Sequence, residues 1–248
     1  CSQSRGLGDV YKRQRQQYHL PTHADSQVLN GLSGLVMPDR AALLDRLNSV
    51  KDALADTEFA FAEQNDHVAV TCPWGNEIRV HEPGERFGAM QLGMPYVEVN
   101  TPEGTADGIV RFYNEIIGSA AWASEDGGAK CANVSAGDGQ TLIYRETADA
   151  IPDYDGHHIA VYLADFSGPY KKLLEREMIS EESDQHQYRF LDVFDPESGD
   201  ALIRIEHEVR SMRHPMYARP LVNRDPRMNN RNYVPGYEAM PYSTAFAG

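Results

Sequence analysis

The feature that most constrains this chain is a pattern of one strand, one helix and three strands that occurs three times, at a spacing of roughly 60 residues. The units run from Val28 to Glu82, from Leu92 to Thr147 and from Tyr154 to Glu208. In the third unit, only two strands are located after the helix, over residues 185–195 and 201–209. Each one carries a period of about 3.6 residues in its helix and about 2 in its strands. A chain built this way is expected to be α+β, with repeated βαβββ units that need a neighbour to bury their apolar faces.

Local signals mark the ends of the expected elements. Asp39 is placed as the N-cap of an amphipathic helix over residues 41–56. Residues 73–76 have the composition of a tight hairpin turn. Gly118 is placed to end the helix of the second unit, and Pro169 falls in the first turn of the helix of the third. These signals support the order of elements independently of the repeat.

Charge and cysteine content narrow the class of protein. The formal charge of -14 argues against nucleic acid and anionic membrane as partners, because both need a basic face. The chain has too few cysteines, at positions 1, 72 and 131, for a disulfide framework or a zinc cluster. No apolar run approaches the roughly 18 residues of a membrane helix. We therefore expect a cytoplasmic protein with a well-solvated surface.

The two ends differ in character from the repeats. Residues 1–14 lack an apolar period and are expected to be foreign to the natural chain, which would then continue upstream. Residues 17–21 read as the last strand of a lost unit, so residues 15–87 are expected to be a truncated half-domain and residues 88–210 a complete two-unit domain. Residues 211–248 read as an extended arm that packs over the core or forms a homodimer.

The third unit holds the most reactive side chains. His157 and His158 open its first strand, and because side chains alternate, only one of the two can face a given side. Glu82, Glu146 and Glu206 each lie seven residues past a turn glycine. A neutral imidazole beside a carboxylate suits a divalent metal, although a hydrogen-bonded histidine and a solvated glutamate fit the same pattern. In the strand around residues 186–190, Tyr188 and His186 are candidates for general acid/base catalysis, or simply polar strand residues.

The order of these features resembles the vicinal oxygen chelate superfamily, which includes glyoxalase I, the bleomycin- and fosfomycin-resistance proteins and the extradiol ring-cleaving dioxygenases. The resemblance rests on the repeated unit, the helix end RFYNEIIG, the turn PWGNEIRV and the turn DPESG before ALIRIE. It covers roughly residues 18–210. It implies units paired into cupped mixed sheets around a metal, with residues 92–208 forming one intact cup.

The resemblance also implies ligands: a His or Gln that opens the first strand of a unit, and a Glu on its last strand. His158 matches the first position and Glu206 the second, with Arg204 or His207 in that slot if the register shifts by one. Glu146 is the candidate third ligand. The second unit departs from the family, because its opening position falls on Met94, Pro95 or Tyr96, and in the first unit the position near Leu32 predicts a metal-free cup.

Two functions follow from the resemblance. The first is a metal-dependent enzyme of the glyoxalase or extradiol-dioxygenase type, in which Fe(II) or Mn(II), ahead of Zn(II), chelates two neighbouring oxygens of a small organic substrate. The second is a metal-free protein that binds a small molecule in the same cup. The match at His158 favours the enzyme, and the missing histidine in the second unit favours the binding protein.

Overall fold

The computed structural model describes residues 25–214 and residue 217, and it contains all three repeats. The first unit comprises β1 (Gly31–Val36), α1 (Arg40–Lys51), the 3-10 turn η1 (Asp52–Leu54), β2 (Ala60–Glu63), β3 (Val68–Thr71) and β4 (Glu77–His81). A short 3-10 turn, η2 (Glu85–Phe87), leads to the second unit. That unit comprises β5 (Gly93–Pro102), α2 (Ala106–Arg111), the π-helical turn η3 (Phe112–Ile117), β6 (Ala121–Asp126), β7 (Ala129–Gly137) and β8 (Gln140–Thr147).

The third unit contains a strand that the sequence pattern missed. It comprises β9 (His158–Leu163), α3 (Ser167–Leu174), β10 (Ile179–Ser183), β11 (Gln187–Phe194) and β12 (Ala201–Ser211). The missed strand is β10, whose sequence ISEES lies at the edge of its sheet and is mostly exposed. A polar edge strand has no apolar alternation to reveal it, because neither of its faces is fully buried.

The expected local signals operate in the structure. The Asp39 side chain accepts a hydrogen bond from the Ala42 backbone N–H at 2.9 Å and caps α1. The apolar face of α1 is only half-buried, and none of its residues is fully buried. In the second unit, Gly118 has φ 77° and closes the π-helical turn η3. Glycine suits that position because an L side chain would be strained at a positive φ.

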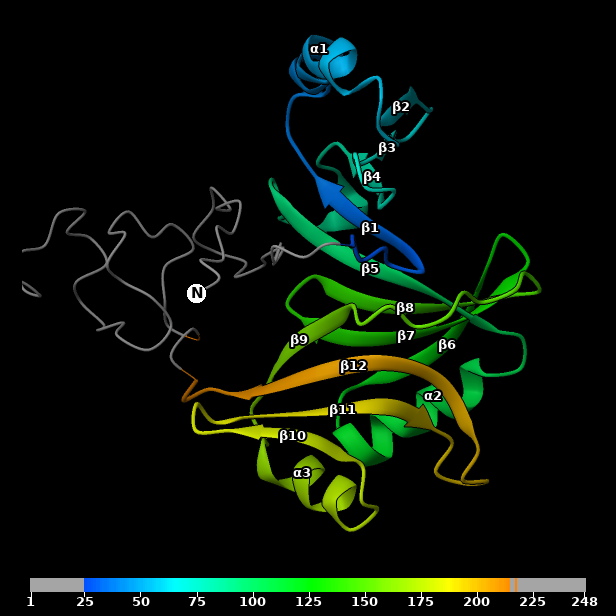
Figure 1. The fold of residues 1–248 in the computed structure, drawn as a ribbon, viewed down its shortest axis with the longest axis vertical. Helices are drawn as coiled ribbons and strands as arrows, with labels where there is room; N and C mark the ends of the chain where they lie inside the picture. The colour runs from blue at the N-terminus through cyan, green and yellow to red at the C-terminus, as the bar shows by residue number, and fades with distance from the viewer. Residues whose placement is uncertain (1–24, 215–216, 218–248) are drawn as a thin grey trace, which may run out of the picture.

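The strands form two mixed sheets (Figure 1). The first two units share an eight-stranded sheet in the order β2-β3-β4-β1-β5-β8-β7-β6, and the third unit forms a four-stranded sheet in the order β10-β11-β12-β9. In each unit the first strand runs parallel to the last one. The two opening strands β1 and β5 pair antiparallel, and this pairing joins the first two units. The α+β architecture of repeated βαβββ units is therefore confirmed.

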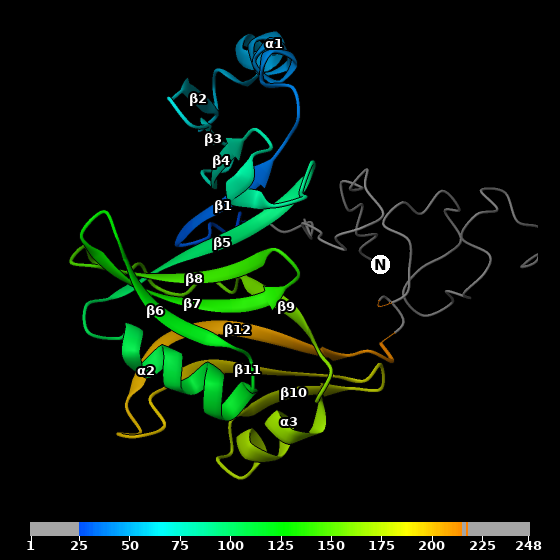
Figure 2. The ribbon, with the colours of Figure 1, turned by 180° about the vertical axis from the view of Figure 1, so that it is seen from behind.

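The pairing of the units differs from the expectation that residues 92–208 form one cup. The second unit shares its sheet with the first unit, and it meets the third unit across a common core (Figure 2). The segment α2–η3 contributes the centre of that core, between the two sheets. The strands of residues 92–208 thus divide between two sheets and do not form one cupped sheet. The domain boundary near residue 87 stays a prediction.

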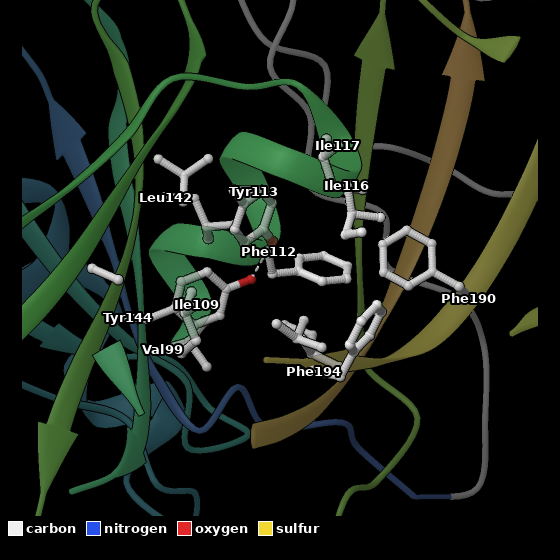
Figure 3. Close-up of a cluster of buried hydrophobic side chains, with 14 of the residues drawn as sticks. Val99, Ile109, Phe112, Tyr113, Ile116, Ile117, Leu142, Tyr144, Phe190 and Phe194 are labelled. Atoms are coloured by element: carbon white, nitrogen blue, oxygen red, sulfur yellow. Dashed lines mark hydrogen bonds between the residues drawn. The ribbon is translucent and has the colours of Figure 1, made fainter. Parts of the chain in front are cut away.

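The shared core contains a buried polar chain. Tyr113, on η3, and Tyr144, on β8, meet through their hydroxyl oxygens at 2.5 Å inside the apolar cluster (Figure 3). The Tyr113 hydroxyl also hydrogen-bonds to Nε2 of His207, whose Nδ1 donates to the Ile205 carbonyl at 2.9 Å. Burial lowers the pKa of His207 to about 4, so the ring is neutral and Nε2 accepts the Tyr113 proton. Each side-chain polar atom in this series of hydrogen bonds, from Tyr144 through Tyr113 to His207, therefore has a partner.

Several sequence expectations fall on residues that lie outside the described part of the chain. They are the foreign segment 1–14, the strand at residues 17–21, and the arm beyond residue 214 apart from Tyr217. The proposed homodimer through that arm stays a prediction. Among the residues that the structure describes, no helix has both the length and the apolar character needed to cross a membrane.

Candidate functional site

One polar strip lies on the face of the eight-stranded sheet that is turned away from the core. Val97 and Val99 on β5 face the core, so Tyr96 and Glu98 face the other side. The ladder places Gly34 of β1 opposite both Tyr96 and Arg79. This strip runs across the opening strands of the first two units, where the resemblance implies metal ligands.

The Tyr96 ring lies over Gly34 and reaches the strand beyond it. A Cβ atom at Gly34 would come within 2.3 Å of the Tyr96 ring, so only glycine leaves room for this crossing. The Tyr96 hydroxyl then meets Nε2 of His81, on β4, at 2.8 Å. Nδ1 of His81 lies 3.1 Å from the Asp66 carbonyl, which can only accept, so Nδ1 carries the proton and Tyr96 donates to Nε2.

Burial acts on both members of this pair. It lowers the pKa of His81, with the Asp66 carbonyl opposing the shift, and it raises the pKa of Tyr96. Both groups are therefore neutral near pH 7, and the proton between them belongs to the phenol. His81 and Tyr96 are 4% and 6% exposed, so the hydrogen bond is sheltered from water.

An ion pair fills the same strip in the second unit. Nε of Arg145, on β8, donates to Glu98 Oε1, on β5, at 2.9 Å, and the guanidinium also binds Asp126. Glu98 is 4% exposed. The opening strand of this unit thus presents Tyr96 in place of histidine, and its last strand presents an arginine on the same face. A cationic side chain at that position disfavours a bound metal ion.

A second polar strip lies on the four-stranded sheet. His158 opens β9 and pairs in register with Glu206 on β12. Nη1 of Arg189, on β11, donates to Glu206 Oε2 at 2.7 Å, and its Nη2 donates to Glu208 Oε2. Nε2 of His158 lies 4.0 Å from Glu208 Oε2. The structure therefore brings His158 together with Glu206, as expected, and adds Glu208.

The remaining candidate ligands lie elsewhere. Glu146 is on β8 of the other sheet, where its Oε1 accepts a hydrogen bond from the Ala106 N–H at the start of α2, at 2.8 Å. His207, the alternative for a shifted register, is 1% exposed and faces the core. Arg204 carries its charge on an exposed side chain. A metal ligand role for His158, Glu206 and Glu146 stays a prediction.

A resident metal does not fit this second strip as it is arranged. The guanidinium of Arg189 already binds the carboxylates of Glu206 and Glu208, and Glu208 also pairs with Arg210. A cation would have to displace these pairs, at the cost of leaving a guanidinium unpaired. The predicted third ligand, Glu146, is held at a helix end. Sequence reasoning missed Arg189, although its alternation with Tyr188 and its position opposite glutamates on the last strand could have revealed it.

The two candidate acid/base residues do not reach this strip together. Tyr188 is 1% exposed and packs in the core against Phe166 and Tyr170. His186 lies in the turn before β11 with φ 60°, and its carbonyl accepts a hydrogen bond from the Ser211 N–H. Because side chains alternate along β11, the polar face receives Arg189 and not Tyr188. Catalytic roles for Tyr188 and His186 stay predictions.

A cavity of about 830 Å³ lies where the two sheets meet the linker between β8 and β9. This is within the usual size range of small-molecule sites. The linker is fixed at its rim, because Asp155 Oδ2 accepts a hydrogen bond from the Val28 N–H at 2.6 Å and its Oδ1 meets His157 Nδ1 at 2.6 Å. Apolar side chains make up much of the lining: Val28, Leu29, Val99, Pro102, Ile151, Pro152, Leu202 and Ile203. Its charged side chains are Glu77, Asp153, Asp155 and Arg204.

One group of side chains has the composition of a metal site. Among the residues that the structure describes, only Asp66, His67 and His81 gather three His, Cys, Asp or Glu side chains within coordination reach. Their ligand atoms all lie within 4.8 Å of one another. This group sits at the β2–β3 hairpin and the end of β4, where His81 pairs in register with Val36 at the end of β1.

Comparison with known proteins finds likeness in solved structures alone. No protein-family model matches the chain, and no curated protein does. Glyoxalase I from Zea mays aligns with a TM-score of 0.47 and 10% identity over 72% of this chain and 66% of its own. A proposed dioxygenase from Bacillus subtilis aligns with a TM-score of 0.43 and 15% identity over 74% of this chain and 62% of its own.

A mutant of the fosfomycin resistance protein FosX from Listeria monocytogenes, solved with Mn(II), aligns with a TM-score of 0.35 and 12% identity over 48% of this chain and 90% of its own. This chain thus spans less than two thirds of the first two proteins and nearly all of the third lies within it. Glyoxalase I, dioxygenases and fosfomycin-resistance proteins are the kinds of protein that the sequence resembles, and at these identities the likeness is one of fold alone.

Proposed function

We propose that this protein binds a small organic molecule in the cavity between the two sheets and needs no metal to do so. Two observations carry this proposal: arginines pair with the carboxylates on both polar strips, and a separate cavity of about 830 Å³ lies between the sheets. Arg145 holds Glu98, and Arg189 holds Glu206 and Glu208. The carboxylates that would neutralise a metal ion are thus neutralised by guanidinium groups.

The lining of the cavity indicates the kind of ligand. Apolar side chains from β5, β12 and the linker supply most of the contact surface, and carboxylates at the rim outnumber cationic groups. Asp155 already accepts a hydrogen bond from the Val28 N–H. Glu77 and Asp153 also line the cavity, where a ligand would compete with water for hydrogen bonds to their carboxylates. The lining therefore favours a molecule with an apolar body and a hydrogen-bond donor, such as an amide or an amine.

The test uses dansylamide, whose fluorescence rises in apolar sites, as a probe of the cavity in the full chain. We expect saturable binding that is unchanged by EDTA. Ile151→Trp would fill the cavity from the linker and weaken binding at least tenfold. Ala148→Trp, on the same linker but outside the lining, is the matched control and should bind like the unaltered protein.

Elemental analysis of the same protein distinguishes the two functions. The metal-free proposal would be overturned if the unaltered protein held near one equivalent of a transition metal, took it up again after stripping and reloading, and lost it on His158→Ala. That result would support a metal-dependent enzyme of the glyoxalase or dioxygenase type. Equal dansylamide binding by the Ile151→Trp and Ala148→Trp variants would reject the cavity as the site.

A further inference from the structure

The loop between β2 and β3 meets the end of β4 at the rim of the eight-stranded sheet, and three metal-binding side chains converge there. Nδ1 of His67 lies 2.7 Å from Asp66 Oδ1. The His67 and His81 rings are 5.5 Å apart between centroids and tilted by 48°. Two imidazoles and one carboxylate form a donor set that suits divalent first-row transition metals. From this convergence we propose that Asp66, His67 and His81 bind one such ion.

The spacing of the ligand atoms is close to what coordination requires. All three lie within 4.8 Å of one another, whereas ligands of a tetrahedral zinc ion lie roughly 3.3 Å apart. Drawing the atoms together therefore takes movements of about an ångström. Asp66 and His67 are on a hairpin loop, and the Asp66 side chain is 67% exposed, so rotation of the loop side chains can make this movement and admit an ion from solvent.

The loop is anchored from α1. The Arg40 guanidinium donates to the carbonyls of Gln64, Asn65 and His67, and the Gln64 N–H donates to the His67 carbonyl at 2.9 Å. These bonds fix the loop backbone on both sides of Asp66. A ligand pair on an anchored loop loses less conformational entropy when it binds an ion than a pair on a free loop does.

His81 provides the buried side of the site and already has an orienting partner. Its Nδ1 is the ring atom turned toward Asp66, at 3.1 Å from the Asp66 carbonyl, and its Nε2 meets the Tyr96 hydroxyl at 2.8 Å. When Nδ1 binds a metal, the ring proton moves to Nε2 and is donated to the Tyr96 oxygen. Tyr96 then acts as a positioning residue, as the outer hydrogen-bond partners of metal-bound histidines commonly do.

This site goes beyond the proposed small-molecule function and is independent of it. It lies on the outer half of the first unit, and its three residues are absent from the cavity lining. Loss of dansylamide binding and loss of metal binding are therefore expected from different substitutions. A negative result for dansylamide binding would therefore leave the metal proposal standing, and a negative result for Zn²⁺ binding would leave the small-molecule proposal standing.

The test is equilibrium dialysis of the metal-stripped full chain against Zn²⁺, followed by elemental analysis. We expect one equivalent to bind, with affinity reduced at least tenfold by His67→Gln or by Asp66→Asn, both on the loop and neither buried. His81→Gln should abolish binding, but His81 is buried, so its folding must be checked by circular dichroism.

The matched control is the exposed turn before β11. It contains an aspartate and a histidine, Asp184 and His186, but among the described residues no third metal-binding side chain lies within coordination reach of them. His186→Gln should leave Zn²⁺ stoichiometry and affinity unchanged. With Co²⁺ as a second probe, the unaltered protein should show visible absorption bands that His67→Gln removes. Equal Zn²⁺ affinity in the unaltered protein and the His67→Gln and Asp66→Asn variants, or no bound Zn²⁺ at all, would overturn the proposal.

Discussion

Two histidines of this protein make the same hydrogen bonds in different surroundings. His207 and His81 each use Nδ1 to donate to a backbone carbonyl and Nε2 to accept from a tyrosine hydroxyl. His207 is fully enclosed in the core, where it stacks on Phe190 with ring centroids 4.4 Å apart. His81 lies at the rim of the other sheet, beside an aspartate and a second histidine.

The difference shows that hydrogen-bond geometry alone does not define a site. In the core, the tyrosine–histidine chain satisfies buried polar atoms and has no route to a ligand. At the rim, the same geometry orients a buried imidazole toward other potential ligands on a loop. Two kinds of experiment should distinguish the core histidine from the rim histidine: unfolding at acid pH, and removal of the hydroxyl of Tyr113 or of Tyr96.

The largest effect is expected from acid. The folded-state pKa of His207 is about 4, below the 6.5 of a free histidine, so the unfolded chain binds more protons between these values. Stability is therefore full above about pH 6.5, falls as the pH drops toward 4, and loses roughly 3 kcal/mol from this residue. Urea unfolding at half-unit pH steps measures the fall.

A control separates His207 from the other shifted histidines. Burial also lowers the pKa of His214 to about 4, so His207→Gln should reduce the slope between pH 6.5 and 4 without abolishing it. A His207→Gln variant with an unchanged slope would contradict the assignment of the acid sensitivity to the core histidine.

The next effect is expected from Tyr113→Phe. Removing this hydroxyl leaves both the Tyr144 hydroxyl and Nε2 of His207 without a partner in the core, which should cost about 2 kcal/mol in the free energy of unfolding. Zn²⁺ binding should not change, because Tyr113 has no contact with the Asp66–His67–His81 group. Urea unfolding and dialysis against Zn²⁺ give the two values.

The smallest effect on stability is expected from Tyr96→Phe, which removes one hydrogen bond and should cost about 1 kcal/mol. Its effect on Zn²⁺ affinity should be larger, a loss of about 10-fold to 100-fold, because His81 loses the partner that orients its ring. The same two measurements apply as for Tyr113→Phe. If both tyrosine variants changed stability and Zn²⁺ affinity alike, the contrast between core and rim would be lost.

Much of the fold follows from local pattern. The three βαβββ units, the Asp39 cap and the glycine that ends the second helix were all predictable, because periodicity and capping depend on neighbours in sequence. The polar edge strand β10 was missed because it buries no regular face. The position of His158 beside Glu206 was also predictable, since each lies at a definite place in its unit.

The tertiary structure decided how the units combine and which polar groups meet. The pairing of β1 with β5 joins strands about 60 residues apart, and no local signal selects it over the pairing of the last two units. The reach of Tyr96 across Gly34 to His81 depends on three strands at once. Arg189, which neutralises the expected ligand Glu206, lies on the neighbouring strand β11. Sequence determines which face a side chain takes, whereas strand pairing determines which charges share that face.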